Sequence, residues 1–216
     1  MDLSRYIDHT LLRADCSEAD IRKLCEEAIG HGFAAVCVPP YFVALVRHLL
    51  EQHSSKLLVT TVVGFPLGYS STPAKVEEIK KAVDDGADEV DAVINLCALK
   101  SSQWSFLEND IDSMCTAARL RGKKIKITLE TTLLSEEEIR QLAKILLASK
   151  PDFVKTSTGF NGNPSLETIH LLQESLENQI AIHATGDFHS RQEAESLIAA
   201  GVKRISTSSG VLLMNR

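Results

Sequence analysis

The chain of 216 residues lacks the features that mark membrane proteins and nucleic-acid-binding proteins. No apolar run approaches the ~20 residues that span a bilayer, and the N-terminal residues form no apolar signal segment. Lysine and arginine form no basic stripe interleaved with aromatic residues, and the formal net charge is -6. We therefore expect a soluble, cytoplasmic protein that binds neither nucleic acid nor membranes.

Cysteine patterns and metal-ligand patterns are missing as well. The cysteines are odd in number, and no CxxC pair or nearby histidine cluster is present. We interpret them as reduced thiols: Cys16, Cys25, Cys37, Cys97 and Cys115. Cys37 lies inside the apolar run 34–38, where a small buried side chain is more frequent than a nucleophile. Because the His, Asp and Glu spacing typical of zinc or magnesium sites is also absent, we expect no metal and no other cofactor.

Strand-like apolar runs alternate with amphipathic helical stretches along the whole chain, and no Pro/Gly/Ser-rich linker divides it. Besides a short segment at 7–8, the expected strands are 33–38, 57–64, 87–96, 124–130, the run around Lys155, 180–185 and 203–207. About eight strand–helix units predict a single-domain (β/α)8 TIM barrel over residues 1–216, with an extra N-terminal helix. The alternative is an open doubly wound sheet, but its usual glycine-rich phosphate turns are absent.

Several of these strands carry polar side chains on one face. Side chains alternate across a strand, so the apolar residues of 124–130 lie on one face and the polar residues on the other. In a barrel the apolar face meets the helices, so the polar face points inward; the same alternation turns Ser157 and Thr185 inward. The charged or titratable side chains placed inside are Asp91, Lys126, Lys155 and His183. Interior charges must be paired or functional, so the cluster indicates an active site, with a structural set as the alternative.

The chemistry of this cluster favours carbonyl substrates. Two lysines a few ångströms apart repel each other as cations, so one of them loses its proton more easily and can attack a carbonyl carbon. Lysine forms Schiff bases in this way, and Lys155 is our candidate. Asp91 is placed to act as the general acid and base on the carbinolamine that forms on Lys155.

Several segments of the sequence carry a family resemblance. They run in order from residue 7 to near the C-terminus: IDHTLL at 7–12, GADEVD at 86–91, KITLET at 126–131, FVKTSTGF at 153–160 and TSSG at 207–210. In these segments the chain resembles the deoxyribose-phosphate aldolases. The resemblance implies a class I, metal-free aldolase that cleaves 2-deoxy-D-ribose 5-phosphate to D-glyceraldehyde 3-phosphate and acetaldehyde.

The resemblance also implies roles for particular residues. Lys155 would form the imine, Asp91 would shuttle protons, and Asp8 and Lys126 match supporting positions of the active site. The expected substrate-binding residues, which hold a small phosphorylated sugar or aldehyde, are Cys37, Thr158, Gly159, Gly186, Ser208, Ser209 and Gly210. The last four of these are the candidates for holding phosphate, and the helix that follows Ser208, Ser209 and Gly210 would help those three.

The chain departs from the family at three positions in the expected active site and phosphate site. Where the family has a second lysine in Lys-Ala-Ser-Gly-Gly, this chain has His183. Either Lys126 supplies the charge that activates Lys155, or His183 carries protons. Asp187 replaces the second glycine, and its carboxylate should repel a phosphate dianion. Ser206 replaces a glycine expected before Thr207.

Three functions remain open on the sequence alone. The first is an active deoxyribose-phosphate aldolase with an altered activating group, and the second is an aldolase of the same class whose substrate has a neutral or cationic tail. The third is a weakly active paralogue that serves as a binding or regulatory module. Barrels of this kind often pair through helix faces, which gives a homodimer as the candidate assembly. The lysines from Lys75 to Lys81 are expected to lie on a solvated helix face.

Overall fold

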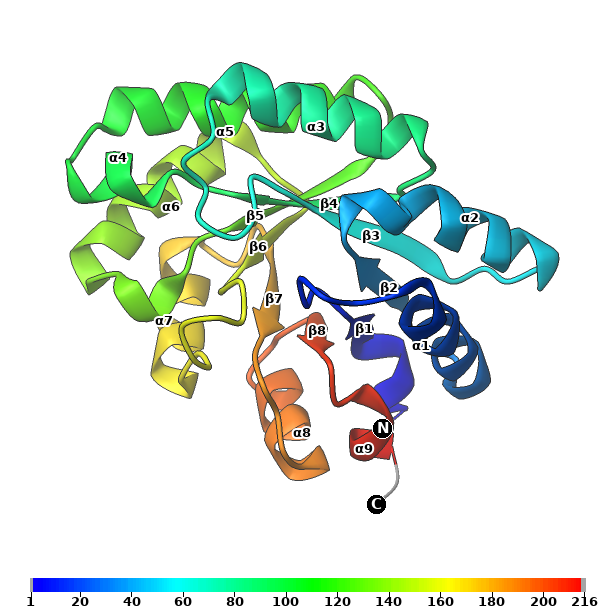
Figure 1. Ribbon diagram of the computed structural model, residues 1–216. Coiled ribbons are helices and arrows are strands. Elements are labelled where there is room, and N and C mark those ends of the chain that lie inside the picture. The colour runs from blue at the N-terminus through cyan, green and yellow to red at the C-terminus, as the bar shows by residue number, and fades with distance from the viewer. Residues whose placement is uncertain (1, 215–216) are drawn as a thin grey trace.

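A computed structural model describes residues 2–214 and shows parallel strands closed into a barrel (Figure 1). Each strand pairs with its neighbours in chain order, and the first strand pairs with the last to close the sheet. The strands are β1 (Ile7–Thr10), β2 (Ala35–Val38), β3 (Leu58–Val63), β4 (Glu89–Val93), β5 (Lys124–Thr128), β6 (Phe153–Lys155), β7 (Ala181–Thr185) and β8 (Arg204–Thr207). The predicted (β/α)8 TIM barrel is confirmed.

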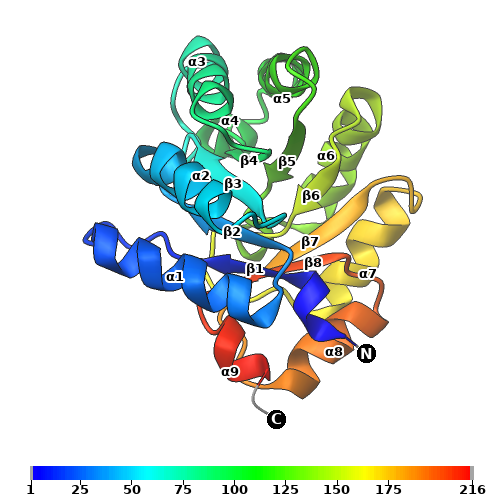
Figure 2. The same cartoon turned by 90° about the vertical axis from the view of Figure 1, so that its right-hand side faces the viewer.

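Helices form an outer layer around the strands (Figure 2). The α-helices are α1 (Glu18–His31), α2 (Val43–Gln52), α3 (Thr72–Asp84), α4 (Leu96–Lys100), α5 (Trp104–Arg119), α6 (Glu136–Ser149), α7 (Leu166–Ser175), α8 (Arg191–Ala199) and α9 (Gly210–Met214). The described residues also form the short 3-10 helices η1 (Leu3–Tyr6), η2 (Pro40–Phe42) and η3 (Thr131–Leu133). Among residues 2–214, the helical segment that precedes β1 is η1, a single 3-10 turn. Within residues 2–214, no helix is long and apolar enough to cross a membrane.

Capping residues set where two of the helices begin. The Ser17 hydroxyl accepts a hydrogen bond from the Asp20 backbone N–H, while the Asp20 carboxylate accepts one from the Ser17 N–H. Ser135 and Glu138 form the same reciprocal pair at the start of α6. Each pair satisfies two backbone N–H groups that the first turn of a helix leaves without partners. These short-range signals are visible in the sequence, and they fix the first residues of the two helices.

The hydrophobic core lies between the outer face of the barrel and the helices. On β5, Ile125 and Ile127 belong to this core, and α1 contributes Ile21 and Leu24 to it. Because side chains alternate along each strand, the opposite face of the same strands is directed into the barrel. The apolar face of each strand thus packs against the helices, and the polar face lies inside the barrel.

Two expected strands end two or more residues earlier in the structure than in the sequence pattern. The segment expected at 87–96 ends as a strand at Val93, because the Asn95 side chain caps the separate helix α4 by accepting a hydrogen bond from Ala98 N–H. The segment expected at 124–130 ends at Thr128, and Glu130 adopts a left-handed conformation with φ of 64°. Both segments are apolar enough to continue as strands. The polar residues Asn95 and Glu130 are therefore the sequence features that lie near the observed strand ends.

The expectation that the lysines of α3 are all solvated is wrong for Lys75. This side chain is fully buried, and its Nζ donates to Asp110 Oδ2 at 2.8 Å and to the Val93 carbonyl at 2.9 Å. The Thr72 hydroxyl donates to the other Asp110 oxygen at 2.7 Å. Burial lowers the pKa of Lys75, and the contacts with Asp110 oppose that shift. The pair fastens α3 to α5 and to the carboxyl end of β4.

Replacing Lys75 with methionine is expected to destabilise the fold by about 3–5 kcal/mol, because it leaves the Asp110 carboxylate buried without its cation. The matched control is Lys80→Met on the same helix, where the exposed pair with Glu77 contributes about 0–1 kcal/mol. Urea unfolding followed by circular dichroism measures both values. Equal midpoints for the two variants would show that the Lys75–Asp110 pair contributes no more than a surface contact.

Candidate active site

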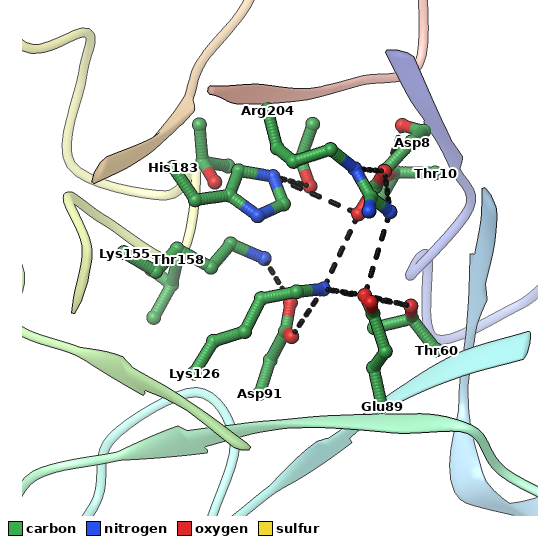
Figure 3. A network of polar contacts seen from close by, with 12 residues as sticks. Asp8, Thr10, Thr60, Glu89, Asp91, Lys126, Lys155, Thr158, His183 and Arg204 are labelled. Carbon is green, nitrogen blue, oxygen red and sulfur yellow. Dashed lines mark hydrogen bonds and ion pairs between the residues drawn. The ribbon is translucent and has the colours of Figure 1, made fainter. Parts of the chain in front are cut away.

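The barrel interior holds a compact network of charged side chains (Figure 3). Three are acidic and three are basic, so their formal charges balance. They are Asp8 on β1, Glu89 and Asp91 on β4, Lys126 on β5, Lys155 on β6 and Arg204 on β8. All six are buried. Such a set is stable away from water because every charge has a partner of opposite sign within contact distance.

Asp91 lies between the two lysines. Its Oδ2 contacts Lys155 Nζ at 2.5 Å, and its Oδ1 lies 3.0 Å from Lys126 Nζ. Burial by itself would raise the pKa of Asp91, but Lys126 and Lys155 outweigh burial and hold that pKa below its usual value. The repulsion expected between the two lysines is therefore offset by the carboxylate that they share. Asp91 is placed to exchange protons with the Lys155 amine directly.

Lys126 is the centre of the acidic contacts. Its Nζ lies 2.8 Å from Glu89, 3.0 Å from Asp91 and 3.3 Å from Asp8. Burial lowers the pKa of Lys126, but these carboxylates outweigh burial and raise the pKa far above its usual value. Lys126 is consequently a permanent cation, and it is unsuited to act as the nucleophile.

Arg204 and Glu89 are members of the network that were not singled out in the sequence. The Arg204 guanidinium contacts Asp8 through Nε at 2.6 Å and Glu89 at 3.4 Å. Carboxylates on both sides raise the pKa of Arg204 against the effect of burial. The sequence did contain a signal for both residues, because side chains two positions apart on a strand share a face. Glu89 is two residues from Asp91, and Arg204 is two residues from Ser206. Alternation therefore places Glu89 and Arg204 on the inward faces of their strands.

His183 is fully buried beside the network and has one partnered ring nitrogen. Its Nε2 lies 2.8 Å from Ser206 Oγ and 3.8 Å from Asp8 Oδ2, whereas Nδ1 has no hydrogen-bond partner among the described residues. Burial lowers the pKa of His183 well below its usual value, and the neighbouring cations lower it further. The imidazole is therefore neutral at physiological pH.

A cavity of about 590 Å³ opens at the carboxyl ends of the strands. Four of the predicted substrate-binding residues line it: Thr158, Gly159, Gly186 and Ser208. Ser206, Thr185 and Thr10 also line it, and Arg13 and Asp187 contribute charges. Lys155 is not among the lining residues; it lies 2% exposed on the strand that ends just before Thr158 and Gly159. The cavity thus begins where β6 ends.

The other predicted binding residues lie outside this cavity. Ser209 lines a neighbouring cavity of about 300 Å³, and Gly210 packs closely on His9, where an added Cβ would come within 2.9 Å of its Nδ1. Cys37 is fully buried, and burial raises the pKa of its thiol to about 12. A thiol with that pKa stays protonated, so Cys37 is not a nucleophile.

Asp187 lies at the rim of the cavity with an exposed side chain. Its carboxylate is 3.5 Å from the Ser209 hydroxyl and 4.0 Å from His189 Nε2. Asn163 holds the backbone of Asp187 from both sides, because its side chain donates to the Asp187 carbonyl and accepts from the Asp187 N–H. This rim loop is therefore fixed by hydrogen bonds, and it presents a negative charge to the cavity mouth.

The described residues contain no cluster of side chains arranged to bind a metal ion. Within residues 2–214, no set of three or more His, Cys, Asp or Glu side chains is arranged to hold an ion.

Known proteins share this barrel and this sequence. A family model described as DeoC/LacD family aldolase matches residues 3–207, which contain the whole charged network. A deoxyribose-phosphate aldolase from Finegoldia magna is 44% identical over 215 residues, which cover 99% of this chain and 99% of that protein. The chain belongs to the DeoC/LacD aldolase family. The resemblance drawn from the sequence motifs is confirmed.

Solved structures of aldolases superpose on the whole barrel. The structure titled "QR15, an Aldolase" has a TM-score of 0.91 and 36% identity, and the match covers 99% of this chain and 94% of that chain. A putative deoxyribose-phosphate aldolase from Coccidioides immitis has a TM-score of 0.94 and 32% identity, with 99% and 85% covered. As a member of the DeoC/LacD aldolase family, the chain is a lyase. The residues Ser208, Ser209 and Gly210 follow the segment that the family model matches.

Proposed function

We propose that the protein catalyses the reversible cleavage of 2-deoxy-D-ribose 5-phosphate to D-glyceraldehyde 3-phosphate and acetaldehyde, with Lys155 as the Schiff-base lysine. The observation that carries this proposal is the buried contact between Lys155 Nζ and Asp91, where Lys155 ends the strand β6 that leads to the cavity, in a chain of an aldolase family. The residue roles predicted from the sequence are part of the proposal. Lys155 is the nucleophile, Asp91 the acid and base, and Asp8 and Lys126 the supporting charges.

The first half of the reaction forms an imine. A proton moves from Lys155 Nζ to the Asp91 carboxylate, and the free amine attacks the substrate aldehyde carbon to give a carbinolamine. Asp91 then returns the proton to the carbinolamine oxygen, which leaves as water, so a C=N bond replaces the C=O bond. The short Lys155–Asp91 distance of 2.5 Å lets this exchange occur without an intervening group.

The second half breaks the carbon–carbon bond. The Asp91 carboxylate, which lost its proton in the first half, removes the proton of the C3 hydroxyl, the C2–C3 electron pair moves toward the imine nitrogen, and glyceraldehyde 3-phosphate leaves while an enamine remains on Lys155. A proton from Asp91 then reaches C2 of the enamine, and water releases acetaldehyde. Lys126 remains positive throughout, because its pKa is held far above the working range by its three carboxylates. The family's second lysine is absent here, and either Lys126 or His183 could take its role beside Lys155. Lys126 supplies the positive charge, because His183 is neutral.

Borohydride trapping tests this function. Incubation with acetaldehyde and sodium borohydride should add two carbons to Lys155 irreversibly, because the reductant converts the imine to a secondary amine. Peptide mapping by mass spectrometry locates the adduct. The absence of any adduct, with a folded protein and no release of glyceraldehyde 3-phosphate, would instead favour the binding-module function. An adduct only at exposed lysines would reject Lys155 as the nucleophile.

An aldolase for a substrate without a phosphate is the second candidate, because Asp187 carries a negative charge at the cavity rim. Arg13 opposes it as the cation of the same cavity, although it is already bound to Asp15 at 2.8 Å. The repulsion by Asp187 and the attraction by Arg13 together set how strongly the cavity binds a phosphate group. Comparing deoxyribose with its 5-phosphate separates the two substrates.

Replacing Asp187 with asparagine is expected to lower KM for the 5-phosphate roughly three- to tenfold, because it removes a repulsion of about 1 kcal/mol between exposed charges. KM for unphosphorylated deoxyribose should stay the same, and the gain should shrink in 0.5 M salt because the charges are screened. Asp112→Asn, an exposed carboxylate on α5, is the control. An unchanged KM in the Asp187 variant would show that this carboxylate does not face the phosphate.

A further inference from the structure

Two hydroxyl groups at the end of the cavity have no role in the steps above. Thr185 on β7 and Ser206 on β8 are partners in the register of these adjacent parallel strands, so their side chains lie next to each other on the inward face. Both residues line the cavity, and both are nine-tenths or more buried, with exposed fractions of 6% and 0%. A ligand that reaches this end of the cavity meets a pair of hydroxyls shielded from water.

The Thr185 hydroxyl is the unsatisfied member of the pair. Its Oγ1 has no hydrogen-bond partner among the described residues, although it is buried. Its backbone is fixed, because Thr185 N–H donates to Thr156 Oγ1 at 3.1 Å and the Thr185 carbonyl accepts from Ser157 Oγ at 2.9 Å. Buried hydroxyls in proteins nearly always have a partner. This one is held rigidly beside the residues that follow Lys155, with its bonding capacity unused.

The Ser206 hydroxyl is oriented by His183. The Asp8 carboxylate lies 3.8 Å from His183 Nε2 and favours the tautomer that carries its proton there, so Nε2 donates to Ser206 Oγ at 2.8 Å. Since Ser206 Oγ accepts this bond, its own hydrogen is left to donate elsewhere. Among the residues that line the cavity, Ser206 is the one with a side-chain hydrogen bond to His183.

The position of the pair along the barrel defines what it can reach. Lys155 is the register partner of His183, and Thr185 is the next inward-facing residue on β7, about 6.6 Å closer to the cavity mouth at ~3.3 Å per residue. The hydroxyls therefore lie on the mouth side of the level of Lys155. Atoms of the substrate chain beyond the imine carbon, but before the phosphate, pass this level.

Resting on the proposed function, we propose that Thr185 and Ser206 form a subsite that binds a hydroxyl group on the carbon chain of the substrate, with His183 as a positioning residue for Ser206. Ser206 donates to the substrate oxygen, and the free Thr185 hydroxyl accepts from the substrate or donates to it. We assign the pair to a hydroxyl group and not to the phosphate because it lies at the level of the substrate's carbon chain.

The variants Ser206→Ala and Thr185→Val test the subsite, with Thr185→Ser as the variant that keeps the hydroxyl and Ser196→Ala as a surface control. Each loss of a hydroxyl should lower kcat/KM for deoxyribose 5-phosphate roughly tenfold, Thr185→Ser should retain more of kcat/KM than Thr185→Val, and the surface control Ser196→Ala should stay near wild type. The same loss is expected with unphosphorylated deoxyribose. Borohydride trapping of acetaldehyde should keep its wild-type rate, because acetaldehyde has no hydroxyl group. Melting temperatures verify that each variant folds.

Three results would overturn the subsite: kcat/KM within threefold of wild type in both variants, an equal slowing of acetaldehyde trapping, or a loss confined to the phosphorylated substrate. Unchanged kcat/KM would show that the two hydroxyls do not contact the substrate. Slower acetaldehyde trapping would show that the substitutions disturb Lys155. A loss confined to the phosphorylated substrate would show that the hydroxyls bind the phosphate. If the proposed function itself is wrong, the wild-type protein forms no borohydride adduct on Lys155. That outcome differs from all three results above, so the failure of the subsite and the failure of the function can be told apart.

The positioning role of His183 has its own test. His183→Gln can still place an N–H group near Ser206, and His183→Leu cannot, so the glutamine variant should retain more of kcat/KM. In the Ser206→Ala background, His183→Leu should cost much less than in wild type, because its effect passes through the missing hydroxyl. Equal costs in both backgrounds would show that His183 does not act through Ser206.

Discussion

Replacing Lys155 with methionine is expected to lower kcat for deoxyribose 5-phosphate cleavage by roughly 10⁵-fold, because a thioether cannot form an imine. Methionine has a similar length and no charge, and Asp91 keeps Lys126 as a partner 3.0 Å away. The barrel should therefore remain folded. A coupled assay for glyceraldehyde 3-phosphate measures the rate, and the borohydride adduct should disappear from the peptide that contains residue 155.

Lys144→Met is the matched control for this variant. Lys144 is exposed on α6, where its Nζ contacts Gln141, and its loss should leave kcat unchanged. A Lys155→Met protein that kept more than a hundredth of wild-type activity would contradict the proposed nucleophile. An adduct that moved to Lys126 would do so as well, because the three carboxylates around Lys126 are expected to keep its amine protonated.

Replacing Asp91 with asparagine is expected to lower kcat by about 10²–10⁴-fold, because an amide has the shape of the carboxylate but cannot exchange protons with Lys155. Steady-state kinetics measure the loss, and the rate of borohydride trapping shows whether imine formation is the slowed step. Asp112→Asn on the exposed side of α5 is the control. Wild-type kcat in the Asp91 variant would assign the proton transfers to another group.

The same variant has a pH signature in stability. The pKa of Asp91 is lowered in the folded protein, so its charge stabilises the fold above the ordinary carboxyl pKa of about 4, and that contribution is lost as the pH falls. The difference in unfolding free energy between wild type and Asp91→Asn should therefore be larger at pH 7 than at pH 3. A difference that does not change with pH would show that Asp91 has the same pKa in the folded and unfolded chains.

The sequence was sufficient for the fold and for one part of the network. The alternation of strands and helices predicted the barrel, and the period of two along 124–130 and 180–185 correctly turned Lys126 and His183 inward. These are local patterns, because they depend on residues a few positions apart. Capping pairs such as Ser17 with Asp20 are local for the same reason.

The missed residues depend on partners far away in the chain. Lys75 looked like a surface lysine because its neighbours on α3 are charged, and its burial comes from Asp110, 35 residues later. Arg204 is held by Asp8, 196 residues earlier. Sequence patterns report which face of an element a side chain occupies, but the pairing of two distant charges appears only after the barrel has closed.

The contact between Asp8 and Arg204 also dictates the timing of assembly. Asp8 lies on the first strand and Arg204 on the last, so a ribosome must deliver nearly the whole chain before this contact can form. Until β8 pairs with β1, Asp8 and Glu89 lack the Arg204 guanidinium as a partner. The charged network around Lys126 and Lys155 is therefore complete only after the final strand has paired.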